Sequence, residues 1–259
     1  MKHGDFTELA AEYVNRTGYS LTALNVISGH IKRTLGKEKL TLADVGAGTG
    51  KLTENLIQLG FSGYTVEPND AMRTEGIKYL KQYGEKFKWS AGTAEVTNLP
   101  DNSVDWVTMG SSFHWADTQQ ALEDFARILR PGGFFTAIFN PRDLERSEFH
   151  LGLEGKIHDM VPNMKRVSSA SAKHMMDVDK KLLSTDLFGD LFFVEAPHEE
   201  LMTRDRYLGA WRSVNDIRVQ AGEELFADIM KMIEAETADM PEIVVPYLSR
   251  AWTVRLNNS

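Results

Sequence analysis

The segment Leu40-Thr41-Leu42-Ala43-Asp44-Val45 runs directly into Gly46-Ala47-Gly48-Thr49-Gly50, and Lys51-Leu52-Thr53-Glu54-Asn55-Leu56-Ile57 follows. The first stretch predicts a short buried strand, and the last predicts a helix. Glycines between them permit positive φ angles and let a ligand approach the backbone without a Cβ in the way. The following helix would offer free amide donors and the positive end of its dipole. This strand, loop and helix therefore predict a binding loop.

The same alternation continues on the C-terminal side. Further strands are predicted at residues 63–67, 86–90, 104–109 and 134–139. Helices are predicted from Asn69 or Asp70 to about Tyr83, and from Asp117 to a stop at Pro131-Gly132-Gly133. Strands that alternate with helices form parallel sheets through right-handed crossovers. We therefore expect an α/β, Rossmann-like, doubly wound and mostly parallel sheet, with its ligand crevice beyond the carboxyl ends of the strands.

The flanking regions are less regular. Apolar residues at helical spacing in the first 36 residues predict two helices that are separated at Tyr19-Ser20. Residues 141–180 lack a clean period and are interpreted as an irregular or helical insertion over the crevice. A strand at 191–201, a helix at 223–235 and a last strand at 243–256 complete the pattern. We expect one domain over 1–259, divided into an N-terminal helical lid (1–36), a ligand-binding core (37–140), a cap insertion (141–180) and a C-terminal half of the core (181–259).

Composition excludes several kinds of protein. The 259 residues include no cysteine, which excludes disulfides, thiolate catalysis and cysteine-ligated metals. The net charge is 29 − 37 = −8, which argues against binding along a nucleic acid duplex. No histidine pair has the spacing of a helical zinc motif, so we expect no metal. The most apolar run, residues 133–139, is too short to span a bilayer, and we expect a soluble, cytoplasmic protein without a membrane partner.

The glycine loop alone could hold a pyrophosphate, a carboxylate or a nucleoside. A dinucleotide fingerprint needs Gly or Ala three positions after its second glycine, and Lys51 stands there. A phosphate-binding P-loop needs four residues between its glycines and then Gly-Lys-Ser/Thr, which is absent. Both phosphate interpretations are therefore weakened.

Four features, in order, resemble the class I S-adenosylmethionine-dependent methyltransferases. Asp44-Val45-Gly46-Ala47-Gly48-Thr49-Gly50 resembles their first motif, and Glu67 resembles their acidic residue at the end of the second strand. Gly92-Thr93-Ala94-Glu95 with Leu99-Pro100 resembles their adenine-binding loop, and Leu129-Arg130-Pro131-Gly132-Gly133 resembles the turn before their fifth strand. The resemblance covers about residues 40–140. It implies the seven-stranded methyltransferase sheet, S-adenosylmethionine as cofactor and S-adenosylhomocysteine as product.

A second resemblance is to the trans-aconitate methyltransferase-like, or methyltransferase type 11, small-molecule group. It lies in Phe6, Ala10, Tyr13, Arg16 and Tyr19, in Phe113-His114-Trp115-Ala116-Asp117, and in Val245-Pro246-Tyr247. It implies a small-molecule methyl acceptor and no nucleic acid partner. It leaves a monomer and a homodimer equally open.

The resemblance assigns roles to particular residues. Glu67 would accept both ribose hydroxyls, Arg16 would clamp the methionine carboxylate, and Thr93 stands where the family usually has an acid. The full expected cofactor set is Tyr13, Arg16, Asp44, Gly46, Ala47, Gly48, Gly50, Glu67, Pro68, Met72, Thr93, Ala94, Gly110 and Ser111.

The expected acceptor set is Tyr19, His114, Trp115 and Trp211, with His114 as the candidate general base. A carboxylate acceptor would need no base, whereas an alcohol, carbon acid or ammonium would. The sequence does not decide between oxygen, nitrogen and carbon acceptors. Five cations in or beside the insertion permit a pocket for an anionic acid: Arg142, Arg146, Lys156, Lys165 and Arg166.

Two other functions compete with methyl transfer. An NAD(P)-dependent oxidoreductase on a similar sheet would also use the glycine loop and Glu67, although Lys51 and the loop at residues 92–95 argue against it. A protein that binds S-adenosylmethionine without catalysis is the third hypothesis, because a fold does not establish an activity.

Overall fold

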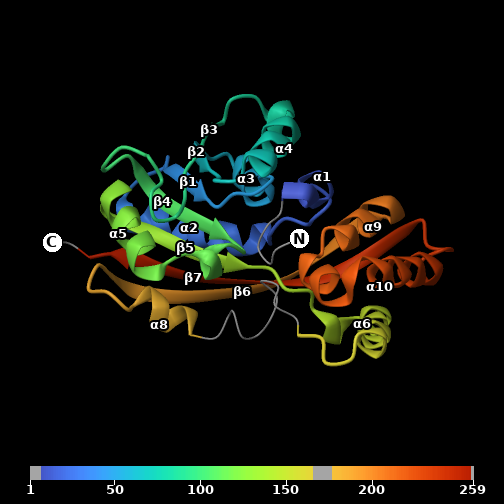
Figure 1. Cartoon of the computed structure of the whole chain (residues 1–259). Helices are drawn as coiled ribbons and strands as arrows, with labels where there is room; N and C mark the ends of the chain where they lie inside the picture. Colours follow the sequence, from blue (N-terminus) through green and yellow to red (C-terminus); the bar gives the residue numbers. More distant parts are fainter. Residues whose placement is uncertain (1–6, 166–176, 258–259) are drawn as a thin grey trace.

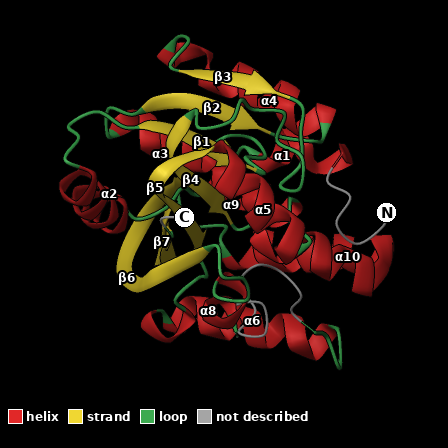
Figure 2. Ribbon diagram, turned by 90° about the vertical axis from the view of Figure 1, so that its left-hand side faces the viewer, coloured by secondary structure: helices red, strands yellow, loops and turns green. Residues whose placement is uncertain are grey.

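A computed structural model of the chain describes residues 7–165 and 177–257. Seven strands form one sheet in the order β3-β2-β1-β4-β5-β7-β6 (Figures 1 and 2). The strands β1 to β5 pair in parallel, and β7 is antiparallel to both β5 and β6. Their bounds are β1 Thr41–Val45, β2 Ser62–Val66, β3 Phe87–Ser90, β4 Val104–Gly110, β5 Leu129–Phe139, β6 Phe188–Thr203 and β7 Glu242–Leu256. The expected seven-stranded, mostly parallel α/β sheet is confirmed.

Helices connect the strands and cover the sheet. The 3-10 helices are η1 Thr7–Leu9, η2 Lys81–Tyr83, η3 Phe113–Trp115 and η4 Leu144–Arg146. The α-helices are α1 Ala10–Tyr13, α2 Leu21–Leu35, α3 Lys51–Gln58, α4 Asp70–Leu80, α5 Thr118–Ile128, α6 Glu148–Met160, α8 Val178–Leu182, α9 Arg204–Arg212 and α10 Asn215–Glu236. Two predicted caps are confirmed, because Asn69 accepts from the Met72 amide and Asp117 accepts from the Gln120 amide.

Each face of the sheet carries its own apolar core. On β5, Phe134 and Ile138 contribute to the core beneath α2 and α3, whereas Phe135, Ala137 and Phe139 contribute to the core beneath α5 and α8. This division follows from the two-residue alternation of side chains along a strand. All five side chains are at most 1% exposed, which is expected for a strand covered on both faces.

A third core lies beyond the edge of the parallel sheet. The strands β6 and β7 form a long hairpin that pairs from Phe188 with Leu256 to Thr203 with Glu242, and α9 and α10 connect them. The far end of this hairpin packs with α6, α9 and α10 around Leu153, Trp211 and Ile229. We call this unit, made of α6, α9, α10 and the hairpin residues 198–203 and 242–247, the helical lobe. It projects to the right of the sheet in Figure 1.

Several predicted boundaries are wrong. The segment Pro131-Gly132-Gly133 does not end a helix but lies inside β5, because the helix already ends at Ile128. The helix α10 starts at Asn215 rather than at residue 223, whereas the helix at residues 148–160 is one of the two forms expected for the insertion. A left-handed Gly222 (φ 76°) kinks α10, which explains why only its second part has a continuous helical pattern. Phe6 and Arg166 lie outside the described residues.

In the described parts of the chain, no helix is both long and apolar enough to cross a bilayer.

Candidate functional site

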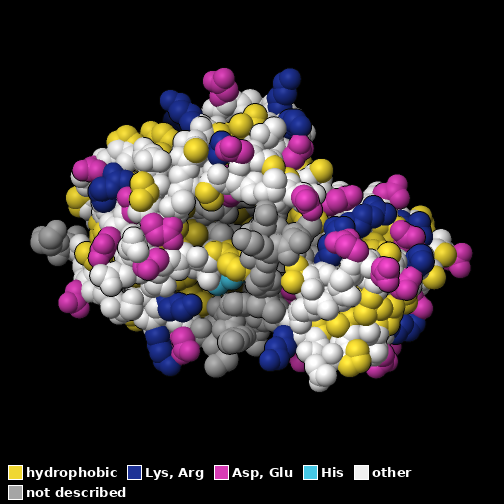
Figure 3. All heavy atoms as spheres, in the orientation of Figure 1, with side chains coloured by type: hydrophobic (Ala, Val, Ile, Leu, Met, Phe, Trp, Pro, Cys, Tyr) yellow, Lys and Arg dark blue, Asp and Glu magenta, His cyan; other side chains and the backbone are white. Residues whose placement is uncertain are grey.

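A cavity of about 530 Å³ lies where the strands β1, β2, β4 and β5 end. Its size is within the range of small-molecule sites. Figure 3 shows this side of the molecule in the orientation of Figure 1, with the helical lobe to the right of the sheet. Fifteen of the predicted site residues line the cavity: Tyr13, Arg16, Tyr19, Asp44, Gly46, Ala47, Gly48, Glu67, Pro68, Met72, Thr93, Ala94, Gly110, Ser111 and Trp115. Gly50, His114 and Trp211 do not.

The glycine loop is held with its backbone toward this cavity. The amides of Gly46 and Ala47 both donate to the Val66 carbonyl, at 2.8 and 3.2 Å, which fixes the loop against the end of β2. Gly48 has a φ of 60°, and a Cβ there would lie 3.3 Å from the Met72 methyl. A side chain at Gly48 would therefore be strained and would fill space at the cavity wall.

Glu67 is the acid beside this loop. One carboxylate oxygen accepts from the Gly48 amide at 2.8 Å, and the other accepts from the Asn69 amide at 2.9 Å. The side chain is buried, and burial raises its pKa above the usual value although both amide bonds lower it. Each oxygen still has acceptor capacity toward the cavity. The arrangement thus fits a ligand that presents two neighbouring hydroxyl groups.

Asp44 lies deeper, at the end of β1. It is fully buried and accepts from the Thr53 hydroxyl at 2.6 Å and from the Thr108 hydroxyl at 3.1 Å. Burial raises the pKa of Asp44 to about 7, although both hydroxyl bonds lower it. Asp44 therefore links β1 to α3 and to β4, and holds the base of the cavity together.

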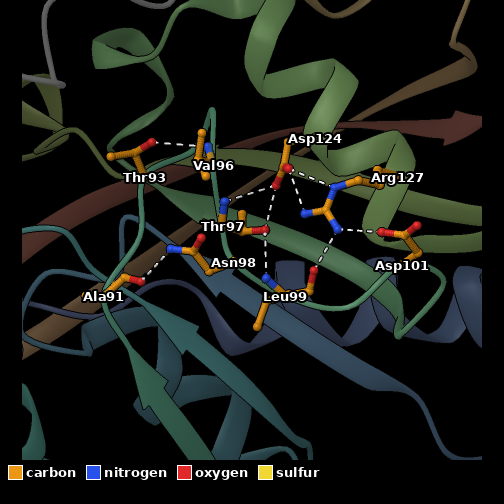
Figure 4. A network of polar contacts seen from close by, with 9 residues as sticks. All are labelled: Ala91, Thr93, Val96, Thr97, Asn98, Leu99, Asp101, Asp124 and Arg127. Carbon is orange, nitrogen blue, oxygen red and sulfur yellow. Dashed lines mark hydrogen bonds and ion pairs between the residues drawn. The ribbon is translucent and has the colours of Figure 1, made fainter.

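Thr93 and Ala94 are presented by a loop that a polar network fixes to α5 (Figure 4). The amide and hydroxyl of Thr97 both donate to Asp124, at 3.1 and 2.5 Å. Arg127 pairs with Asp124 at 2.7 Å and donates to the carbonyl of Leu99 at 2.7 Å. The loop is thus positioned by bonds on the side away from the cavity.

The N-terminal segment closes another wall. Arg16 donates from Nε to the Ser213 hydroxyl at 2.6 Å and from Nη2 to the Ser213 carbonyl at 2.9 Å, which ties this segment to the helical lobe. The Tyr19 hydroxyl donates to the Ser111 hydroxyl at 3.0 Å, just after β4. Burial raises the pKa of Tyr19. Both residues reach the cavity as neutral or cationic donors at neutral pH.

The predicted acceptor residues separate in the structure. Trp115 lines the cavity and remains 47% exposed. The His114 ring instead packs with the rings of Trp115 and Phe139, at 4.7 and 6.1 Å between centroids. Trp211 is buried in the core of the helical lobe, and the Arg142 guanidinium lies 4.0 Å above its ring. The structure therefore does not bring His114 or Trp211 to the cavity.

Gly50 also has a packing environment rather than a cavity position. Its φ is 82°, and a Cβ there would lie 2.8 Å from a methyl group of Leu80. It allows the turn into α3 and the close approach of α4.

Some cavity residues were not predicted as site residues. They include Lys51, Asn69, Asn140, Arg142, Leu144, Glu154 and Tyr247. Asn140, Arg142 and Leu144 follow β5, Glu154 lies on α6, and Tyr247 lies on β7. In the sequence, only the basic character of Arg142 and the Val245-Pro246-Tyr247 segment indicate this group. Within residues 7–165 and 177–257, no group of three His, Asp or Glu could hold a metal ion.

The comparisons with known proteins agree with this geometry. Residues 43–137 match the family described as methyltransferase domain. An uncharacterized methyltransferase of Mycobacterium tuberculosis is 40% identical over 100 residues, which is 39% of this chain and 40% of that protein. An uncharacterized methyltransferase of Schizosaccharomyces pombe is 25% identical over 210 residues, covering 76% of this chain and 75% of that protein.

The fold is also shared with solved structures. That of a putative type II methyltransferase from Anaeromyxobacter dehalogenans has a TM-score of 0.62 at 19% identity, covering 94% of this chain and 97% of that one. The chain therefore has the Rossmann-like fold of that structure. The match of residues 43–137 to the methyltransferase domain family supports the resemblance to the class I, S-adenosylmethionine-dependent methyltransferases. The match spans about 40% of the length of the mycobacterial relatives.

Proposed function

We propose that the chain is an S-adenosylmethionine-dependent methyltransferase that acts on a small molecule. The observation that carries the proposal is the buried Glu67 carboxylate, held by the Gly48 and Asn69 amides at the edge of the cavity. A carboxylate with acceptor capacity beside a glycine loop suits a ribose diol. The family match of residues 43–137 supports the same cofactor.

The cofactor would be held by residues that already line one cavity. Glu67 would accept the ribose hydroxyls, and Thr93 and the Ala94 amide would face the adenine. Arg16 would pair with the methionine carboxylate through the donors that Ser213 leaves free. The carbonyl of Gly110 would face the ammonium group. These roles rest on the family resemblance and on the position of each residue in the cavity wall.

The protein's contribution to methyl transfer would be position and the exclusion of water. S-adenosylmethionine supplies a methyl group that is already activated on a sulfonium. Tyr13, Tyr19 and Trp115 would cover the reacting region, and the helical lobe would form the opposite wall. We propose that residues 1–36 and 141–180 act as lid and cap on a single domain of this kind.

The alternative functions are less well supported. A nicotinamide cofactor would also use Glu67, but Lys51 lines the cavity where a dinucleotide fingerprint requires a small residue. A non-catalytic binding protein is distinguished from an enzyme only by a turnover measurement.

The test is calorimetric titration of the purified protein with S-adenosylhomocysteine, and with NADH and NADPH in parallel. We expect binding of S-adenosylhomocysteine alone. The Glu67→Gln variant should bind it on the order of 100-fold more weakly, because charge-assisted hydrogen bonds are lost. Glu85→Gln, at an exposed position, is the matched control and should bind normally. Tight binding of NADH or NADPH without S-adenosylhomocysteine would overturn the proposal in favour of an oxidoreductase.

A further inference from the structure

The charge at the acceptor side of the cavity comes from one arginine. Three cations line the described cavity wall: Arg16, Lys51 and Arg142. Arg16 is engaged by Ser213, and Lys51 donates to the Tyr79 hydroxyl at 2.6 Å. Burial lowers the pKa of Lys51 to about 8, so its charge is also the least secure of the three.

The structure also sorts the five cations in and beside the predicted insertion. Arg146 and Lys165 are exposed, and Lys156 pairs with Glu236 at 2.6 Å. Arg166 lies outside the described residues. Among the described members of this set, Arg142 is the one that reaches the cavity.

Arg142 is held in place from both sides. Its backbone bridges to Tyr247 of β7, the Asp143 amide donates to the Pro246 carbonyl at 2.9 Å, and the Leu248 amide donates to the Pro141 carbonyl at 2.9 Å. Its guanidinium lies 4.0 Å above the Trp211 ring. The side chain is therefore laid on an aromatic surface by a rigid backbone, which is a suitable arrangement for bidentate recognition.

Arg142 forms no ion pair with a described carboxylate, although Glu154 lines the same cavity. Within the described residues, no carboxylate lies within 4.0 Å of its guanidinium. Burial lowers its pKa, but Tyr247, Tyr207 and the Glu154 carboxylate raise it above the usual value. The guanidinium therefore stays charged. A half-buried cation without an ion-pair partner is costly, and a bound anion would lower that cost.

We propose that Arg142, together with the hydroxyl of Tyr247, binds a carboxylate group of the methyl acceptor, an inference that rests on the proposed function. Arg142 follows β5, and the neighbouring β4 ends at Gly110, directly before Ser111. An acceptor anchored there lies beside the strand end at which the cofactor would present its methyl group. The anchor fixes orientation and does not itself exchange a proton.

A carboxylate fits this site better than a phosphate does. A guanidinium can compensate a single negative charge with two parallel hydrogen bonds. A phosphate dianion would need a second cation, and Arg16 and Lys51 are engaged elsewhere. The Glu154 carboxylate, which also lines the cavity, would repel the extra charge.

The experiment measures binding of matched acids and amides to the full chain. Acetate, benzoate and succinate are titrated against acetamide, benzamide and succinamide, with and without saturating S-adenosylhomocysteine. We expect at least one acid to bind at least about tenfold more tightly than its amide. Arg142→Gln should remove this preference, Arg142→Lys should keep part of it, and Arg146→Gln, an exposed arginine four positions away, should leave it unchanged.

Two readouts keep the result decisive. S-adenosylhomocysteine affinity within about threefold of the native value shows that Arg142→Gln is folded. If that variant does not fold, Tyr247→Phe removes only a hydroxyl and should still reduce the preference for the acid. Failure of all three acids to bind at about 50 mM, or an equal effect of Arg142→Gln on acid and amide, would overturn the inference. Failure of the native protein to bind S-adenosylhomocysteine instead concerns the proposed function, because the titrations without it still report on Arg142.

Discussion

At one end of the cavity, Gly48 and Glu67 are joined by a single helix and strand. At the other end, Arg142 and Tyr247 come from distant parts of the chain, and Trp211 packs beneath the Arg142 guanidinium. The first end includes the Gly48 amide and two buried acids, Asp44 and Glu67. The second end presents a cation on an aromatic surface. The proposed cofactor contacts are therefore built into a local chain segment, whereas the proposed acceptor contacts depend on how the helical lobe docks against the sheet.

The two ends also differ in how they respond to pH. Asp44 at the glycine-loop end titrates near neutrality, because burial raises its pKa from 3.8 to about 7. Arg142 at the other end stays charged. The pH dependence of stability that originates in the cavity is therefore expected from the glycine-loop end.

The largest predicted effect is on stability and concerns Asp44. Between about pH 4 and pH 7 the folded state holds a proton on Asp44 that the unfolded state has released, so the free energy of unfolding should fall as pH rises through this window. A rise in the pKa of Asp44 from 3.8 to about 7 corresponds to a change of at most about 4 kcal/mol in the free energy of unfolding. Urea unfolding of the native protein and of Asp44→Asn across this range measures the effect. The free energy of unfolding should fall less steeply with pH in Asp44→Asn than in the native protein.

Asp105 is the control of opposite sign. It lies in the same sheet and is bonded to Lys37 at 2.6 Å and Arg130 at 2.9 Å. Burial alone would raise the pKa of Asp105. The two cations and the Thr41 amide outweigh burial, so the net pKa lies below the usual value. The contribution of Asp105 to the free energy of unfolding should be lost as pH falls. Asp105→Asn should therefore reduce the loss of stability at acidic pH. Identical profiles for Asp44→Asn and the native protein would refute the assignment to Asp44.

Much of the first end could be predicted from the sequence. Helix caps, strand alternation and glycine turns depend on neighbouring residues in the sequence. Asn69 and Asp117 therefore predict helix starts, and the segment Asp44 to Gly50 predicts the turn after β1. The sequence predicts that β5 starts at Phe134 rather than at Leu129, because Gly132 and Gly133 are typical of a turn. In the structure, a Cβ at Gly133 would lie 3.0 Å from the Asp105 carbonyl, so that glycine serves close packing inside a strand.

The second end could not be predicted in the same way. The sequence offers five cations around the insertion, and the choice of Arg142 depends on its backbone bridge to Tyr247, a long-range contact. His114 follows β4 as the family pattern implies, but its ring packs with Phe139 rather than reaching the cavity. Tertiary packing decides both outcomes, and local patterns do not encode it.

The next predicted effect is on cofactor affinity and concerns Arg127. This side chain holds the loop of Thr93 and Ala94 through Asp124 and the Leu99 carbonyl without lining the cavity (Figure 4). Arg127→Gln should weaken S-adenosylhomocysteine binding by about tenfold, because the loop loses charge-assisted bonds and must be ordered on binding. The measurement is calorimetric.

The control for Arg127 is on the same helix. Gln119 bonds only to the exposed Glu123 side chain among the contacts described for it, and Gln119→Ala should bind S-adenosylhomocysteine normally. Arg127→Gln should leave the acid-to-amide preference at Arg142 intact, because it acts at the other end. Loss of both S-adenosylhomocysteine binding and the acid-to-amide preference would show that Arg127 supports the whole fold instead of one loop.

The smallest predicted effect concerns the connection between the two ends. Arg16 is a proposed cofactor residue, and Ser213, at the end of α9, belongs to the helical lobe. The Arg16 Nε donates to the Ser213 hydroxyl at 2.6 Å. Since this bond requires the lobe to be docked, cofactor and acceptor binding should strengthen each other by about threefold, and the coupling must be the same in both directions. Ser213→Ala removes the hydroxyl while Arg16 keeps its 2.9 Å bond to the Ser213 carbonyl. The variant should therefore bind each ligand alone almost normally but should lose the coupling, measured as the ratio of S-adenosylhomocysteine affinities with and without the bound acid. An unchanged ratio would mean that the two ends of the cavity communicate by another route or act independently.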